Sequence, residues 1–219
     1  MSNNDLDIYE ETFYFCDNKK IDDITLESMK KYKRIYFTNL FNQPVNNLPS
    51  EVLEINFGDS FNQYVDYLPS GVKNITFGCN FNKPIDNLPY ELEKLNFVMF
   101  SEFNQAVDNL PIGLQSIIFG LYFNQCLDNL PISLKSIILG DNFNQSINNL
   151  PYGLKIISFG NSFNYPVDNL PSSLKIIRFG KYFDQPLDKL PSGLQTLMLS
   201  TYYIQSLNNL PYSLIIERI

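Results

Sequence analysis

The sequence contains no histidine and no tryptophan, and it has only three cysteines. Without histidine, it lacks the commonest general base and the commonest protein ligand for metals. Catalysis would have to rely on carboxylates, so the composition favours a non-enzymatic protein. The cysteines, Cys16, Cys79 and Cys126, are odd in number and far apart, which predicts reduced thiols and a cytoplasmic location.

Basic residues and long apolar runs are also scarce. Sixteen Lys and Arg residues against 23 Asp and Glu residues give a net charge of −7 and a pI near 4.6. Nucleic-acid-binding surfaces need an excess of positive charge, so the sequence argues against a nucleic-acid partner. The chain has no apolar run long enough to cross a membrane, and its N-terminus lacks the basic and apolar regions of a signal peptide, so no membrane association is expected.

What the sequence does contain is a repeat. A tetrapeptide related to Phe-Asn-Gln-Pro recurs nine times, usually at a spacing of twenty residues. Its copies begin at Phe41, Phe61, Phe81, Phe103, Phe123, Phe143, Phe163, Phe183 and, in degenerate form, Tyr203. Such a period predicts a solenoid, in which each repeat contacts only its neighbours. We expect a solenoid of about nine repeats over residues 41–219, preceded by an N-terminal cap over residues 1–40.

One copy, residues 143–162, shows how a coil is built. The positions that are apolar in nearly every copy are here Phe143, Ile147, Leu150, Leu154, Ile157 and Phe159. Ile157 and Phe159 are two residues apart, so a strand at this point directs both inward and directs Ile156 and Ser158 outward. Equivalent strands of adjacent repeats are expected to pair in parallel.

Glycine and proline mark the turns of the coil. Gly160 follows the strand, where we expect a turn that needs a permissive backbone. Pro151 is predicted at the second position of a tight turn, with Gly153 at the fourth. A proline in so short a coil leaves no room for a long helix, so extended or 3₁₀ segments are expected on the convex side.

The second position of the motif is asparagine in seven consecutive copies. These residues are Asn42, Asn62, Asn82, Asn104, Asn124, Asn144 and Asn164. Amides both donate and accept hydrogen bonds, so the column is interpreted as a buried structural ladder between coils. The alternative is a row of amides that binds a ligand.

The repeat unit, Phe-Asn-Gln-Pro-(Val/Ile/Leu)-(Asp/Asn)-Asn-Leu-Pro-x-x-Leu-x-x-(Ile/Leu)-x-Phe-Gly, resembles the FNIP repeat of leucine-rich-repeat-like solenoids. The resemblance covers residues 41 to about 214. It implies a mainly β, right-handed coil with a parallel sheet on its concave face, and a role in protein–protein interaction. FNIP repeats are characteristic of amoebae and of the giant viruses that infect them, so a viral member would work in the host cytoplasm.

Members of that family often carry an F-box that recruits a ubiquitin ligase, but residues 1–40 show no clear three-helix pattern. We expect instead a β-α-β cap with a strand from Thr12 to Cys16 and a helix from Ile24 to Lys33, with Asp23 as its N-cap. Ile35 and Phe37 lie twenty residues before Ile55 and Phe57 and would form the first strand in register. The alternative function, a substrate-recruiting adapter in a ubiquitin pathway, rests on analogy alone.

The partner should be recognised where the repeats differ. Outward strand positions are polar in the early repeats and partly apolar in the later ones. The candidate partner-binding residues on the concave face are Ile118, Ile138, Ile156, Ile176, Arg178 and Met198. Exposed apolar residues that become contiguous on stacking predict a contact surface. The alternative is that isoleucine simply favours strands.

A column of carboxylates could suggest a metal site. It consists of Asp66, Asp86, Asp108, Asp128, Asp168 and Asp188. Asparagine replaces aspartate freely in other copies, and no glycine-rich ligand loop accompanies the column, so Asx turns explain it better than calcium does. We therefore predict no metal and no cofactor.

Two irregularities break the period. Residues 98–102 lengthen the third repeat by two residues, and their apolar content makes this expected bulge a second candidate contact. In the last repeat Glu217 falls where an inward isoleucine is expected. A final edge strand would leave unpaired backbone groups, so self-association through the C-terminal strand is a further hypothesis.

Overall fold

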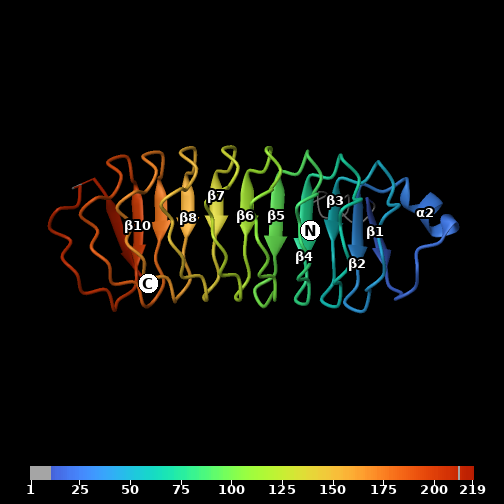
Figure 1. Cartoon of the computed structure of the whole chain (residues 1–219), viewed down its shortest axis with the longest axis horizontal. Helices are drawn as coiled ribbons and strands as arrows, with labels where there is room; N and C mark the ends of the chain where they lie inside the picture. Colours follow the sequence, from blue (N-terminus) through green and yellow to red (C-terminus); the bar gives the residue numbers. More distant parts are fainter. Residues whose placement is uncertain (1–10, 212) are drawn as a thin grey trace, which may run out of the picture.

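Each repeat forms one coil, and each coil contributes one short strand to a single parallel sheet. The computed structural model describes residues 11–211 and 213–219 and places the strands side by side in chain order (Figure 1). The strands are β1 (Thr12–Phe15), β2 (Arg34–Phe37), β3 (Glu54–Asn56), β4 (Asn74–Phe77), β5 (Lys94–Phe97), β6 (Ser116–Ile118), β7 (Ser136–Ile138), β8 (Ile156–Ser158), β9 (Ile176–Arg178), β10 (Thr196–Leu199) and β11 (Ile215–Arg218). The predicted mainly β solenoid with a parallel sheet is confirmed.

The period of the sequence sets the register of the sheet. Ile117 of β6 pairs with Ile137 of β7, which pairs with Ile157 of β8, so identical residues lie side by side. All three side chains are fully buried, whereas the strand residues before and after each of them are half-buried or exposed. The structure thus shows the alternation between inward and outward positions that the sequence predicts.

Two columns of aromatic rings fill the core behind the sheet. One column comes from strand ends such as Phe57, and the other from the first residue of each motif, such as Phe61. The rings of Phe57 and Phe61 stack within one coil, with centroids 4.0 Å apart. Between coils, the rings of Phe61 and Phe81 stack with centroids 6.1 Å apart. Each coil is therefore stabilised mainly by the coils on either side of it.

The side of each coil opposite the sheet consists of extended segments and isolated turns. The carbonyl oxygen of Pro151 accepts a hydrogen bond from the amide of Leu154 at 3.0 Å, and the same bond recurs in every repeat. The turn therefore runs from Pro151 to Leu154, with proline first and Gly153 third. The prediction that proline is second and Gly153 fourth is wrong by one position. No 3₁₀ helix occurs within the described residues, because one turn suffices to lead the chain back to the sheet.

The glycine that follows most strands is needed for close contact between coils. None of the glycines, all of which the structure describes, has a positive φ angle, so the predicted need for a permissive turn conformation is wrong. A Cβ atom on Gly160 would instead overlap the carbonyl group of Gly140 in the preceding coil. Gly140 lies against Gly120 in the same way, and Gly180 against Gly160. The absence of a side chain lets these backbones approach one another.

The N-terminal segment is a modified coil that continues the sheet. In the described part of the predicted cap, β1 pairs with β2, and helix α2 (Asp23–Met29) replaces the usual turns between them. The helix is shorter than predicted, and its N-cap is Asp22, not Asp23, because the Asp22 side chain accepts a hydrogen bond from the amide of Thr25. The first ten residues of the predicted cap lie outside the described residues.

The last strand departs from the predicted register by one residue. Ile216 of β11 pairs with the inward Leu197, whereas Glu217 pairs with the outward Met198. The prediction that Glu217 takes an inward position is wrong, because the last coil is one residue shorter than the usual period of twenty. Arg218 occupies the strand-end position instead, and its Nη1 atom donates hydrogen bonds to the carbonyl oxygens of Ser200 and Tyr203 at 3.0 and 3.2 Å.

Candidate functional site

The outward side chains of the strands form a surface that we call the open sheet face. It is the face predicted to be concave. All six candidate partner-binding residues lie on it. Ile138, Ile156 and Arg178 are exposed, with 39% of the Ile138 surface and 37% of the Ile156 surface open to solvent, and Ile118, Ile176 and Met198 are half-buried. The strand hydrogen bonds hold these residues on a regular backbone frame.

The apolar residues of this face fall into two adjacent pairs. Ile118 pairs with Ile138 across β6 and β7, and Ile156 pairs with Ile176 across β8 and β9. The two pairs occupy neighbouring rows of the face, since Ile138 lies opposite Ser158 in β8. The apolar surface therefore runs diagonally across four strands. Met198 lies one strand further along, opposite Arg178.

The two-residue insertion adds apolar surface next to the first pair. After β5 the chain bulges outward, leaving Met99 and Phe100 largely exposed while Ser101 is buried. Met99 and Phe100 border a hollow of about 330 Å³, which Ile118 and Ile138 line from the sheet. The structure thus joins two features that the sequence suggested separately, the bulge and the apolar strand residues.

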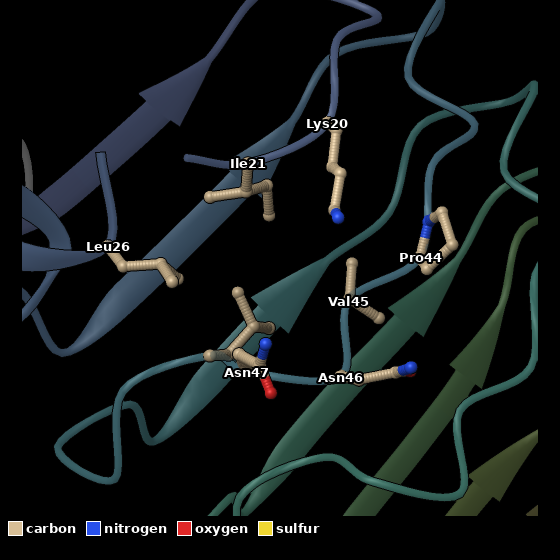
Figure 2. A pocket seen from close by; sticks show the side chains of 8 residues that line it. Lys20, Ile21, Leu26, Pro44, Val45, Asn46 and Asn47 are labelled. Atoms are coloured by element: carbon tan, nitrogen blue, oxygen red, sulfur yellow. The ribbon is translucent and has the colours of Figure 1, made fainter. Parts of the chain in front are cut away.

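A second hollow lies between the cap and the first repeat and has a volume of about 270 Å³. Figure 2 shows Ile21 and Leu26 of the cap facing Val45 and Asn47 of the repeat across this space. The hollow lies where helix α2 replaces the usual turns, because the short helix does not fill the space that a full coil would occupy. Its lining combines apolar side chains with the amides of Asn46 and Asn47 and the ammonium group of Lys20.

The asparagine column joins the coils by hydrogen bonds. The Oδ1 atom of Asn124 accepts a hydrogen bond from the backbone amide of Asn144 at 2.9 Å, and Asn144 accepts in the same way from Asn164 at 3.0 Å. The series begins in the cap, where Asn18 accepts from the amide of Asn42 at 2.8 Å, a member that the sequence reading missed. The column is not buried as predicted, since its side chains are half-buried or exposed.

Because the ladder uses the side chains as acceptors, the amide nitrogen should be dispensable. We expect Asn124→Ala to lower the free energy of unfolding by about 1 kcal/mol, the usual net value of one hydrogen bond. Asn124→Asp should cost less, since a carboxylate oxygen can accept the same bond as the amide oxygen. Urea denaturation of the two variants compares these losses. Equal losses would contradict an acceptor role.

The aspartate column forms a second ladder. The side-chain amide of Asn129 donates to Asp108 in the preceding coil at 3.1 Å, and Asn149 donates to Asp128 at 2.9 Å. These carboxylates accept hydrogen bonds from asparagine side chains of the next coil. Contacts between coils therefore explain the column, and the predicted Asx turns do not. No group of three or more possible metal ligands among His, Cys, Asp and Glu is found in residues 11–211 and 213–219.

The three cysteines are free thiols, in keeping with the wide separation of Cys16, Cys79 and Cys126 in the sequence. The thiol of Cys126 donates a hydrogen bond to the carboxylate of Asp128 at 2.6 Å. This contact raises the pKa of the Cys126 thiol and, together with the Asn149 amide, lowers the pKa of Asp128. Burial raises the pKa of the Cys79 thiol. These shifts favour the protonated thiol, which is the less nucleophilic form.

The C-terminal end of the sheet is partly closed by polar contacts. Tyr203 is buried in the aromatic column, and its hydroxyl group donates to the carbonyl oxygen of Gln185 at 3.0 Å. Burial raises its pKa to about 12. Within the described residues, β11 pairs with β10 alone, and the side chains of Ile215 in β11 and of Ile219 after it are exposed. Self-association through this strand remains a hypothesis.

In the part of the chain that the structure describes, no helix is long and apolar enough to span a membrane. No curated protein matches the sequence. Among solved structures, the chain is similar to CroV588, a circular leucine-rich-repeat protein from a giant virus, with 32% identity and a TM-score of 0.74. The match covers 92% of this chain and 35% of that protein, so the chain spans about a third of that protein's length.

A family model for the FNIP repeat matches the chain in five overlapping or adjacent segments. They are residues 64–98, 103–142, 127–162, 143–182 and 163–202. These segments include the motifs from Phe81 to Phe183 and the strands from β4 to β10. Together they take in more than half of the sequence, and the chain belongs to the FNIP-repeat family of leucine-rich-repeat-like solenoids.

Proposed function

We propose that this chain is a non-enzymatic scaffold that binds a protein partner through the open sheet face. The observation that carries the proposal is the apolar hollow formed by Met99, Phe100, Ile118 and Ile138 on an otherwise regular sheet. Apolar side chains around a hollow can receive the anchor residues on which most of an interface's binding energy depends. Solenoids of the leucine-rich-repeat type commonly bind other proteins through such extended surfaces.

The backbone around this surface supports the proposal. The residues of β6, β7 and β8 are held in register by parallel pairing on both sides. A surface on a rigid frame loses little conformational entropy when a partner binds. The free thiols fit a reducing compartment, so we place the scaffold in the cytoplasm.

The adapter alternative would need a ligase-binding helical module next to the repeats. In the described part of residues 1–40, the chain forms two strands and the seven-residue helix α2, all belonging to the first coils of the solenoid. This arrangement supports a capping role for the segment. The interaction scaffold is therefore the function that the geometry favours.

Affinity capture with matched variants tests the proposal. The chain would be immobilised and exposed to an amoebal lysate, in parallel with Ile138→Asp and Ile156→Asp. We expect each aspartate variant to lose the captured partner, because it removes an apolar contact and a carboxylate must lose its hydration at an interface. Binding would be measured by quantitative mass spectrometry.

Ile132→Asp is the matched control. Ile132 lies in the same coil as Ile138 but on the turn that precedes β7, and it is exposed. This variant should retain the partner and show that a new carboxylate in this coil is tolerated. A partner that is retained by both Ile138→Asp and Ile156→Asp would contradict binding through the open sheet face.

A further inference from the structure

Three lysines form a column beside the apolar residues of the open sheet face. Lys135, Lys155 and Lys175 each precede a strand, β7, β8 and β9 respectively. At this point the coils of β3 to β10 carry a bulge, as where the amides of Lys155 and Ile156 both donate to the carbonyl oxygen of Lys135, at 2.9 and 3.0 Å. Because of the bulge, the consecutive residues Lys155 and Ile156 both face away from the core. Lys155 therefore lies next to Ile156 at the edge of the open sheet face.

These lysines lack the carboxylate partner that Lys73 has in an early coil. In the same column, the ammonium group of Lys73 binds the carboxylate of Glu93 in the next coil at 2.9 Å. Among the described residues, no ion pair reaches Lys135, Lys155 or Lys175. The Nζ atom of Lys175 donates instead to the carbonyl oxygen of Gly193 at 3.0 Å.

Like charges on adjacent strands of a sheet repel one another and lower stability. Neighbouring strands are about 4.8 Å apart, so the three lysines start from closely spaced backbone positions along the sheet edge. The chain as a whole carries a net charge of −7, which makes an uncompensated basic column unusual here. A bound anionic group would remove the repulsion.

The same face carries no acidic strand residue between β6 and β10. Its outward strand residues are Ser116, Ile118, Ser136, Ile138, Ile156, Ser158, Ile176, Arg178, Thr196 and Met198. The carboxylate at the far end of β7, Asp141, accepts two hydrogen bonds from Asn161 in the next coil. On this half of the face, basic groups and isoleucines therefore adjoin one another.

We infer that strands β6 to β10 bind an acidic segment of the partner protein, with its carboxylates on the lysine column and its apolar side chains on Ile138 and Ile156. The inference rests on the proposed function and specifies the chemistry of the partner. Five strands span about 19 Å, which an extended segment of about six residues covers. A nucleic acid fits less well, because the isoleucines beside the lysine column offer its backbone no phosphate contacts.

Peptide selection tests this inference without a known partner. Phage-displayed random peptides of about 12 residues, twice the length of the strip, would be selected on the chain. We expect enrichment of peptides rich in Asp and Glu that also contain Leu, Ile or Phe. Peptides without an acidic bias, or no enrichment, would overturn the inference, whereas the capture experiment with Ile138→Asp tests the proposed function separately.

The best selected peptide, labelled with a fluorophore, would then be titrated against variants. Lys155→Glu should weaken its binding by about tenfold or more, since it replaces the central cation of the column. The same variant should raise Tm, because the new carboxylate would stand between two lysines, as Glu93 stands beside Lys73. Weaker binding with higher thermal stability cannot be explained by damage to the fold.

Lys20→Glu is the control, because it makes the same change in net charge on the exposed surface of the cap, where Lys20 lies. It should leave the affinity for the peptide within a factor of about two. An equal loss with both variants would show a general charge effect and overturn the inference. Single-stranded DNA would be titrated as well, and tighter binding of DNA than of the peptide, lost in Lys155→Glu, would also overturn it.

Discussion

Replacing Phe123 with alanine is expected to lower the free energy of unfolding by about 3–5 kcal/mol, the range for large aromatic residues in cores. Phe123 is fully buried, and its ring stacks on those of Phe103 and Phe143 at centroid distances of 6.1 and 6.2 Å. It also stacks on Phe119 of its own coil at 3.7 Å. The cavity would not collapse easily, because hydrogen bonds of the sheet fix the spacing of the coils.

Urea denaturation followed by circular dichroism measures this loss, with Tyr122→Ala as the control. Tyr122 is the preceding residue and is exposed, so its truncation should change stability by less than about 0.5 kcal/mol. Since each coil is stabilised by its neighbours, the loss should reach both adjacent interfaces. Similar values for the two variants would show that the aromatic column does not carry the stability of the solenoid.

The repeat period made most of the fold predictable from the sequence. Where the spacing is twenty residues, one copy such as residues 143–162 defines the inward positions of the others. The spacing of Ile157 and Phe159 predicts that both point inward, and both are buried. Strand alternation and repeat stacking both depend on residue spacing, and a single sequence contains that information.

Contacts between successive coils were harder to predict. The hydrogen bond from Asn149 to Asp128 joins residues of different type that lie 21 positions apart, so neither column alone indicates it. The one-residue shortening before β11 sets Ile216, and not Glu217, opposite the inward Leu197, and the repeat period alone does not indicate this shift. These outcomes depend on which of the competing hydrogen bonds and strand registers between stacked coils has the lower free energy.

The candidate site was predictable only in part. The outward positions of Ile138 and Ile156 follow from alternation, but the hollow beside Met99 depends on the path of the two inserted residues. The lysines also recur every twenty residues in the sequence. They lie beside the open sheet face because of the bulge at Lys155 and Ile156. Strict alternation of inward and outward residues does not predict this bulge.

Replacing Gly160 with alanine is expected to cost about 3 kcal/mol, at the upper end of the usual range for overpacking. The new methyl group would overlap the backbone carbonyl of Gly140, which cannot move aside as a flexible side chain could. The sheet would have to open between β8 and the strand before it, which weakens pairing there. Urea denaturation gives the loss, and faster amide hydrogen exchange in β7 and β8 would locate it.

Gly71→Ala is the matched control for this substitution. The atom nearest to a Cβ on Gly71 is the carbonyl oxygen of Ser50, at 3.9 Å, which is an ordinary contact. Because its φ angle is not positive, alanine should fit and raise stability by about 0.4–1 kcal/mol through a less flexible unfolded chain. Opposite signs for the two glycines would show that spacing between coils, and not turn conformation, requires glycine after the strands. Destabilisation of both by the same amount would contradict this explanation and restore a conformational role for the turns.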